Sequence, residues 1–466
     1  ALITRMFIVT RLLFFVIWEK TCRIFHIWYN KHTYDFIIAG FFSDTTSNFT
    51  GLSFFCHHFE VIFLRVAGII VEYNPLHMGH VHLLEETRRL LGEDTAVVCA
   101  MSGDFVQRGD FALVRRQARA AAAVQSGADL VLELPLPWAA APAERFAHGG
   151  VQTLLAAGVV DTLVFGSECG DAAALRRLAA ALLEEDFSLR LRRELERGDS
   201  FAAARQRAVS GLVCPADAVL LEQPNNILGV EYCKSLLRQN AGVEVLTIPR
   251  VGAAHDAEAA PPDQNASAAA IRTLLRQERR EEALGRMAPA MREVYMAETA
   301  AGRAPVFLEN CERAVLARLR WMEAADFAAL DQGREGLHRR LYDASRAAVS
   351  VAELLEAAKT KRYAYARLRR MVLWAYLGLL PREFPEEILY LRPLAANSAG
   401  RELLARMRRT ASVPVLTKPA AVRRLGKGAR DLFALEARAA DLYALAYPDL
   451  SAAAGGALWR EGPVML

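Results

Sequence analysis

The chain has 466 residues, of which 53% are hydrophobic and 24% are charged, and its formal net charge at pH 7 is +4. This is the composition of an ordinary globular protein with room for two or three domains, and it excludes a disordered or fibrous chain. The small net charge does not identify a nucleic-acid partner. The 7 cysteines form no CxxC pair, which predicts a reduced, cytoplasmic protein without a structural zinc site or other bound metal.

Residues 1–65 differ from the rest of the chain in composition. They are rich in Phe, Ile, Thr, Tyr and Asn, whereas the following residues are rich in Ala, Arg, Leu and Glu. The apolar run 6–18 is interrupted by Arg11 and is shorter than the roughly 20 residues that a membrane span needs. We expect residues 1–65 to be an atypical N-terminal extension outside the functional fold, and we expect no membrane association.

After this segment, the sequence predicts a strand, a turn and a helix that begins with two histidines. Residues 66–71 predict a buried strand, the Asn-Pro pair at 74–75 predicts a turn, and His77-Met-Gly79-His80 begins a predicted helix. A helix N-terminus presents free backbone N–H groups and the positive end of the helix dipole, so it is suited to bind phosphate. The two histidines can donate ring N–H bonds, and Gly79 lets a nucleotide approach the backbone.

Four further apolar runs predict strands, and they lie at 95–101, 128–135, 159–165 and 244–248. Helical patterns separate them, so we expect a Rossmann-like α/β fold with a doubly wound parallel sheet over residues 66–283. Ligands in such sheets bind beyond the carboxyl ends of the strands. We expect the residues at these ends to share one pocket, and they are Gly79, Ser102, Arg108, Gly166 and Ser167.

Helical patterns dominate from about residue 284, and we expect an all-helical, basic domain over residues 284–466. Its most charged segment is 359–374, where arginines and lysines alternate with tyrosines. Basic side chains contact phosphates and aromatic rings stack on unpaired bases. The candidate RNA contacts are Lys361, Arg362, Tyr363, Arg367 and Arg370. A solvated helix face explains the same pattern, and both interpretations stay open.

The other candidate site residues can also be explained without a function. HxGH by itself recurs by chance, and only its place between a strand and a helix favours nucleotide binding over a turn with incidental histidines. Asn225 and Asn226 either cap a helix or contact a ligand. Arg250 and Arg272 are either surface arginines or cations at the ligand edge of the sheet.

Six motifs occur in a fixed order between residue 66 and the C-terminal part of the chain. They are IIVEYNPLHMGH at 69–80, MSGDFVQRGD at 101–110, FGSE at 165–168, QPNNILGVEY at 223–232, SAAAIR at 267–272 and TKRY at 360–363. Together they resemble the bacterial tRNA(Met) cytidine acetate ligases, a family of nucleotidyltransferase-like enzymes.

The resemblance implies a two-step reaction. Acetate and ATP form acetyl-adenylate and release pyrophosphate, and the acetyl group then passes to the wobble cytidine of elongator tRNA(Met) to give N4-acetylcytidine. ATP is thus a substrate, Mg²⁺ is its expected counter-ion, acetate and elongator tRNA(Met) are the partners, and no obligate protein partner is expected.

The resemblance also implies roles for individual residues. The catalytic residues are His77, His80 and Arg272. The ATP-binding residues are Ile70, Val71, Glu72, Tyr73, Asn74, Pro75, His77, Gly79, His80, Leu83, Gly166, Asn225, Asn226 and Arg250. From their place at a strand end or in the basic segment, and not from the resemblance, we expect the substrate-binding residues to be Ser102, Arg108, Lys361, Arg362, Tyr363, Arg367 and Arg370.

The chain departs from the family pattern at three positions. Leu76 stands where phenylalanine is usual, and Met78 stands where asparagine is usual, inside HxGH. Asp104 replaces another asparagine and is expected to bring a carboxylate near the phosphates, with Mg²⁺ or Arg108 offsetting its charge.

Three other classes share parts of this pattern. Small-molecule adenylyltransferases of the pantetheine-phosphate or nicotinate-mononucleotide type share HxGH, but they are generally short. A non-catalytic RNA-binding protein with a relic nucleotide pocket does not need intact histidines. An aminoacyl-tRNA synthetase needs a lysine-rich second signature, for which only Lys359-Thr-Lys361 is available.

Overall fold

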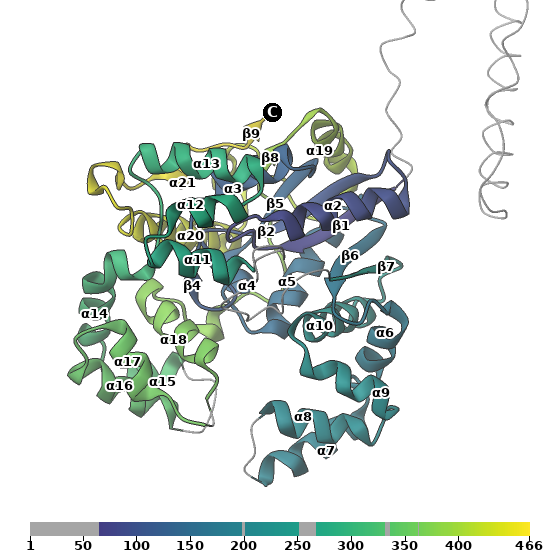
Figure 1. Cartoon of the computed structure of the whole chain (residues 1–466), viewed down its shortest axis with the longest axis horizontal. Helices are drawn as coiled ribbons and strands as arrows, with labels where there is room; N and C mark the ends of the chain where they lie inside the picture. The colour runs from purple at the N-terminus through teal and green to yellow at the C-terminus, as the bar shows by residue number, and fades with distance from the viewer. Residues whose placement is uncertain (1–64, 198–200, 251–266, 331–335, 362) are drawn as a thin grey trace, which may run out of the picture. The chain divides into compact units, whose positions relative to one another are not determined.

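The computed structural model describes residues 65–197, 201–250, 267–330, 336–361 and 363–466 (Figure 1). Residues 1–64 of the expected N-terminal extension and Arg362 lie outside these ranges. Within them, no helix combines the length and the apolar character that a membrane crossing needs.

A seven-stranded sheet forms the centre of the fold, in the order β7-β6-β1-β2-β5-β8-β9. Its strands are β1 (Val66–Val71), β2 (Ala96–Ser102), β5 (Leu130–Leu134), β6 (Thr162–Ser167), β7 (Glu244–Pro249), β8 (Pro393–Ala396) and β9 (Val464–Met465). The five strands from β7 to β5 are mutually parallel. All five coincide with predicted strands, so the expected parallel sheet is confirmed.

The strands lack polar alternation because both faces of the sheet are covered. In β1, Val66 and Ile70 face one hydrophobic cluster, while Ala67 and Ile69 face another. The first cluster includes side chains of α5 (Ala143–Ala156), α6 (Ala172–Ala181), α10 (Pro224–Arg238), α19 (Ser398–Thr410) and α20 (Lys427–Ala444). The second includes those of α2 (Met78–Leu91), α3 (Arg116–Gln125), α11 (Ala268–Arg276), α12 (Arg280–Arg286) and α13 (Pro289–Ala300).

Further helices complete the described part of the fold. They are α4 (Leu136–Ala139), α7 (Glu185–Glu196), α8 (Phe201–Ser210), α9 (Pro215–Ala218), α14 (Glu312–Trp321), α15 (Ala324–Leu330), α16 (Leu337–Ala347), α17 (Val351–Ala358), α18 (Tyr365–Leu377) and α21 (Ala457–Arg460). Helices α14 to α18 enclose a third hydrophobic cluster. A small hairpin of β3 (Phe105–Val106) and β4 (Asp110–Phe111) adds Phe105 and Phe111 to that cluster.

The sequence analysis expected the C-terminal part to be all-helical, but it also contains two strands. Strand β8 pairs antiparallel with β5, and β9 pairs with β8. These strands have four and two residues, too few for an alternating pattern to be visible in the sequence. Residues on both sides of position 284 therefore build one sheet, and the domain boundary at 283 stays a prediction.

Candidate active site

The HxGH turn joins β1 to α2 and is held by reciprocal capping bonds. His77 is the N-cap residue, and its Nδ1 accepts a hydrogen bond from the N–H of Gly79 at 3.1 Å. The Nδ1 of His80 accepts from the N–H of His77 at 3.2 Å. Because each Nδ1 is an acceptor, the proton of each neutral ring resides on Nε2. The local fold thus sets the tautomer that can donate to a phosphate oxygen.

The residues before the histidines fix the turn. The ring of Tyr73 meets that of His80 edge-on, with 5.0 Å between centroids. The side chain of Asn74 accepts from the N–H of Leu113 at 2.7 Å. A Cβ at position 79 would lie 3.0 Å from the His77 ring, so glycine fits there with the least crowding. Met78 is exposed.

Glu72 directly follows β1 and lies among positively charged side chains. Its carboxylate accepts from the N–H of Gln107 at 2.7 Å. Burial raises the pKa of Glu72, although the charges of Arg272, Arg108 and Arg119 act in the opposite direction. Burial and the charge of Glu72 raise the pKa of Tyr232 on α10. Glu72 therefore lies near side chains from four other segments.

Arg272 connects α11 to this group. Its guanidinium forms an ion pair of 2.9 Å with Asp110 and donates to the carbonyl of Asn74 at 3.5 Å. The fold therefore brings Arg272 and the 105–111 hairpin to the HxGH turn. Ser102 ends the neighbouring strand, and its buried hydroxyl has no hydrogen-bond partner among the described residues.

Arg119, which the sequence analysis did not single out, holds the strand ends in place. It is fully buried, and its guanidinium donates to the carbonyls of Val114, Ser102, Glu72 and Gly103. Burial lowers its pKa. Helix α3 has two arginines among its alanines, Arg116 and Arg119, and nothing in the sequence marks either for a buried role.

The opposite side of the site comes from β6 and α10. The carboxylate of Glu168 accepts from the side-chain amide of Asn225 at 2.7 Å and from the N–H of Asn226 at 2.7 Å. In return, the buried side chain of Asn226 accepts from the N–H of Glu168 at 3.0 Å. Asn226 therefore fixes the loop after β6, as a capping residue does.

Gly166 lies next to Arg250. A Cβ on Gly166 would stand 3.4 Å from the Cγ of Arg250. The N–H of Arg250 donates to the carbonyl of Ser167 at 2.9 Å. The predicted residues Gly166, Asn225, Asn226 and Arg250 thus gather at the ends of β6 and β7.

Helix α18 packs against the hairpin. A Cβ on Gly109 would lie 2.4 Å from the backbone nitrogen of Arg370. The guanidinium of Arg370 donates to the carbonyl of Gln107 at 3.3 Å. Burial and the nearby Arg367 lower the pKa of Arg370 to about 10. Arg370 therefore supports the hairpin, and its expected contact with RNA is not evident from this position.

The other predicted RNA contacts differ in exposure. Lys361 is exposed. Tyr363 is buried, and Arg367 lies 5.5 Å from the centroid of its ring. The expected stacking of a base on Tyr363 is therefore not supported by its position. The helical spacing of the segment did not reveal which tyrosine faces the core.

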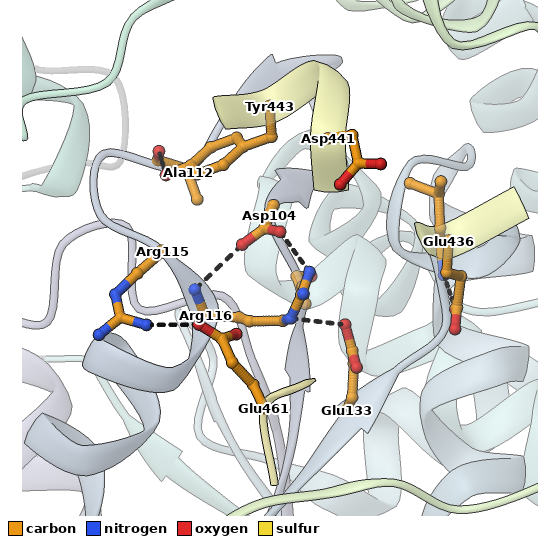
Figure 2. A network of polar contacts seen from close by, with 12 residues as sticks. Asp104, Ala112, Arg115, Arg116, Glu133, Glu436, Asp441, Tyr443 and Glu461 are labelled. Atoms are coloured by element: carbon orange, nitrogen blue, oxygen red, sulfur yellow. Dashed lines mark hydrogen bonds and ion pairs between the residues drawn. The ribbon is translucent and has the colours of Figure 1, made fainter. Parts of the chain in front are cut away.

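Asp104 lies in a separate buried network (Figure 2). Its carboxylate pairs with the guanidinium of Arg116 and accepts from the backbone N–H of Arg116 at 3.0 Å. Arg116 also lies 4.0 Å from Glu133. The charge of Asp104 is thus offset by Arg116, and the expectation that Mg²⁺ or Arg108 does so is corrected. Within the described residues, no cluster of three His, Cys, Asp or Glu side chains suits a metal ion.

Known proteins are similar to this chain over most of its length. The family model of the HIGH Nucleotidyl Transferases matches residues 64–456. A tRNA(Met) cytidine acetate ligase of Fervidobacterium nodosum is 36% identical over 363 residues, which cover 76% of this chain and 84% of that protein. One of Acetivibrio thermocellus is 35% identical over 398 residues, which cover 82% and 95%.

Solved structures are similar as well. The apo form of Thermotoga maritima TmcAL has a TM-score of 0.83 and 33% identity, and the match covers 86% of this chain and 100% of that one. The form bound with alpha-thio ATP has a TM-score of 0.79 and 32% identity, with the same coverage. The chain therefore belongs to the tRNA(Met) cytidine acetate ligase family of HIGH nucleotidyltransferases.

Proposed function

We propose that this protein uses ATP to activate acetate and then acetylates the wobble cytidine of elongator tRNA(Met). The observation that carries the proposal is the histidine pair at the N-terminus of α2, where two backbone N–H groups hold Nδ1 of both rings as acceptors. Membership of the acetate ligase family supports it, and so does the relative bound to an ATP analogue.

In the first step, an acetate oxygen attacks the α-phosphorus of ATP. The new O–P bond forms as the bond to pyrophosphate breaks, so positioning and charge stabilisation matter more than a general base. His77 and His80 donate from Nε2 to the phosphates, together with the dipole of α2. Arg108, Arg250 and Arg272 add positive charge, and Asp110 orients Arg272.

In the second step, the exocyclic amine of cytidine attacks the acetyl carbonyl. The C–N bond forms, AMP leaves, and the amine loses one proton. An anticodon loop presents this base unpaired, so the enzyme does not have to open a duplex. Lys361, which is exposed, and Arg367, which is half-buried, are proposed to bind the tRNA backbone.

Mg²⁺ is proposed to enter with ATP, because this ion in nucleotide sites keeps several waters and binds mainly through substrate phosphates. Acetate is the proposed acid. The cytoplasm is the proposed compartment, as the five free cysteines among the described residues suggest.

The test is to incubate the protein with labelled acetate, ATP and tRNA. Label is expected in elongator tRNA(Met) only when ATP is present, and a transcript with uridine at the wobble position should stay unlabelled. Transfer of adenylate to a small phosphate ester, without RNA labelling, would instead favour a small-molecule adenylyltransferase. Salt-sensitive RNA binding without any turnover would favour a non-catalytic protein.

A further inference from the structure

A second concave site lies in the helical part of the chain. The end of α14, the start of α15 and the end of α18 surround a cavity of about 730 Å³. This lies within the range of volumes that ligand sites usually have. We call it the Trp321 hollow, and its polar and aromatic lining includes Arg318, Arg320, Trp321, Glu323, Asp326 and Trp374.

Trp321 is the most exposed large hydrophobic side chain in the described part of the chain, at 82%. It is the last residue of α14. A single exposed hydrophobic residue needs no explanation on a protein surface. Here, however, the indole borders a cavity that also contains charged side chains, so a flat ligand with polar edges can stack on it.

The arginines of the Trp321 hollow donate hydrogen bonds to uncharged backbone carbonyl groups. Arg318 donates to the carbonyl of Ala375 at 3.4 Å, and Arg320 donates to that of Ala348 at 2.8 Å. Both partners are uncharged backbone oxygens, and neither arginine forms an ion pair with a carboxylate of the described residues. Their positive charge is therefore available to a phosphate group.

The acidic side chains give the hollow acceptors for base amino groups. Asp326 accepts from the N–H of Glu323 at 2.9 Å, which holds its carboxylate at the start of α15. Glu323 is exposed. Arginine donors, carboxylate acceptors and an exposed indole together match a nucleotide, which has a planar base, polar base edges and an anionic phosphate.

Helix α18 links the hollow to the candidate active site. Arg370 contacts the hairpin at Gly109, and Ala375 lines the hollow. The two residues are five positions apart on α18, which corresponds to a rise of about 7.5 Å along the helix. Stacked nucleotides advance about 3.4 Å each along a strand, so two or three nucleotides span the part of α18 between the hairpin contact and the hollow.

We propose that the Trp321 hollow binds an unpaired nucleotide of the tRNA close to the cytidine that is modified. The base stacks on Trp321, and Arg320 contacts its phosphate. This inference rests on the proposed function, because it takes the RNA substrate from there.

The test compares Trp321→Ala, Trp321→Phe and the control Phe201→Ala, which removes another exposed aromatic ring, on α8. A synthetic anticodon stem–loop of elongator tRNA(Met) serves as the probe in a direct binding measurement. Loss of a stacked base should raise the Kd of Trp321→Ala about tenfold, while Trp321→Phe and Phe201→Ala stay within about twofold of wild type. The KM for tRNA should change in parallel.

Two measurements separate this inference from the proposed function. Acetate-dependent exchange between ATP and pyrophosphate needs no tRNA, and it should be unchanged in Trp321→Ala. Arg320→Gln should reduce the slope of log Kd against log salt concentration by about 0.7 to 1.

A wild-type Kd and KM in Trp321→Ala would overturn the inference while the proposed function stands. Dissociation of an oligomer by Trp321→Ala, without a change in RNA affinity, would overturn it in favour of a protein interface. Conversely, stem–loop binding that depends on Trp321 in a protein without acetate-dependent exchange would support the hollow and contradict the proposed function.

Discussion

The backbone N–H groups of His77 and Gly79 have two roles in the HxGH turn. They take part in the capping of α2, and they orient the rings of His80 and His77. His77 and His80 were predictable from the sequence, since HxGH directly follows a buried strand. Arg119 was not, because nothing in an alanine-rich helix indicates that its arginines are buried. Met78 is exposed, and nothing in the structure explains why methionine stands there.

Removing the Arg119 guanidinium should destabilise the protein. Arg119→Met leaves four carbonyls without their donor, three of them buried and that of Glu72 partly buried, and each unsatisfied buried group costs about 1–3 kcal/mol. We expect the free energy of unfolding to fall by about 3 kcal/mol or more in a urea titration. Arg89→Met, at an exposed arginine on α2, should change it by less than about 0.5 kcal/mol. Equal effects of the two variants would contradict the role of Arg119.

The charge of Glu72 should reduce stability as the pH rises. Burial raises the pKa of Glu72, so the folded protein retains this proton to higher pH than the unfolded chain does. Stability from such a group is greatest below the unfolded pKa of about 4.3 and declines as pH rises through the folded pKa. Glu72→Gln stays neutral and still offers an acceptor to Gln107.

The free energy of unfolding should therefore fall more steeply with rising pH in the wild type than in Glu72→Gln, starting near pH 4.3. Urea titrations between pH 4 and 8 measure this difference. Parallel pH profiles of the wild type and Glu72→Gln would show that burial does not disfavour the charged form of Glu72.

Among the elements, the five parallel strands were predictable because each is a continuous apolar run between turn signals. Strands β8 and β9 were not, since two to four residues carry no periodic pattern. The sequence also showed two glycines between β2 and α3 without revealing what they contact. The structure places one of them, Gly109, directly against the backbone of α18.

Gly109→Ala tests the contact between the hairpin and α18. Gly109 has φ +75°, and an added Cβ would meet Arg370 backbone atoms at 2.4 Å. Gly378 is the matched control, because it has φ +69° and nothing lies within 4 Å of an added Cβ. Both variants should lose about 1 kcal/mol from the left-handed backbone, and Gly109→Ala should lose a further 1–3 kcal/mol from overpacking.

Gly109→Ala should also impair tRNA acetylation more strongly than Gly378→Ala, since α18 must shift to accept the methyl group. Thermal melts and initial rates measure both effects. Identical behaviour of the two variants would mean that the hairpin and α18 are not tightly packed.

For the whole molecule, the C-terminal part completes the catalytic fold as well as adding helices. Strand β8 covers the edge of β5. The carboxylate of Glu436 on α20 accepts from the N–H of Leu136 at 3.0 Å, and the hydroxyl of Tyr443 donates to the carbonyl of Ala112 at 2.7 Å. Sequence patterns report on neighbouring residues, so contacts across 300 positions stay invisible to them.

A fragment of residues 65–283 should therefore not fold like the full chain. It exposes the edge of β5 and the hydrophobic surface that α19 and α20 cover, which favours aggregation. We expect the fragment to melt without a cooperative transition, whereas residues 65–466 melt cooperatively. A fragment that melts at the temperature of the longer chain would contradict this account and support an independent domain ending at 283.

We propose that the histidine pair at the start of α2 activates acetate with ATP. The most direct measurement is the acetate-dependent exchange of labelled pyrophosphate into ATP in the absence of tRNA. Wild type should exchange, His80→Ala should lose at least about 100-fold in rate, as removal of an electrostatic donor does, and His82→Ala, one turn into the same helix, should stay close to wild type. Exchange without acetate, or full activity in His80→Ala, would contradict the claim.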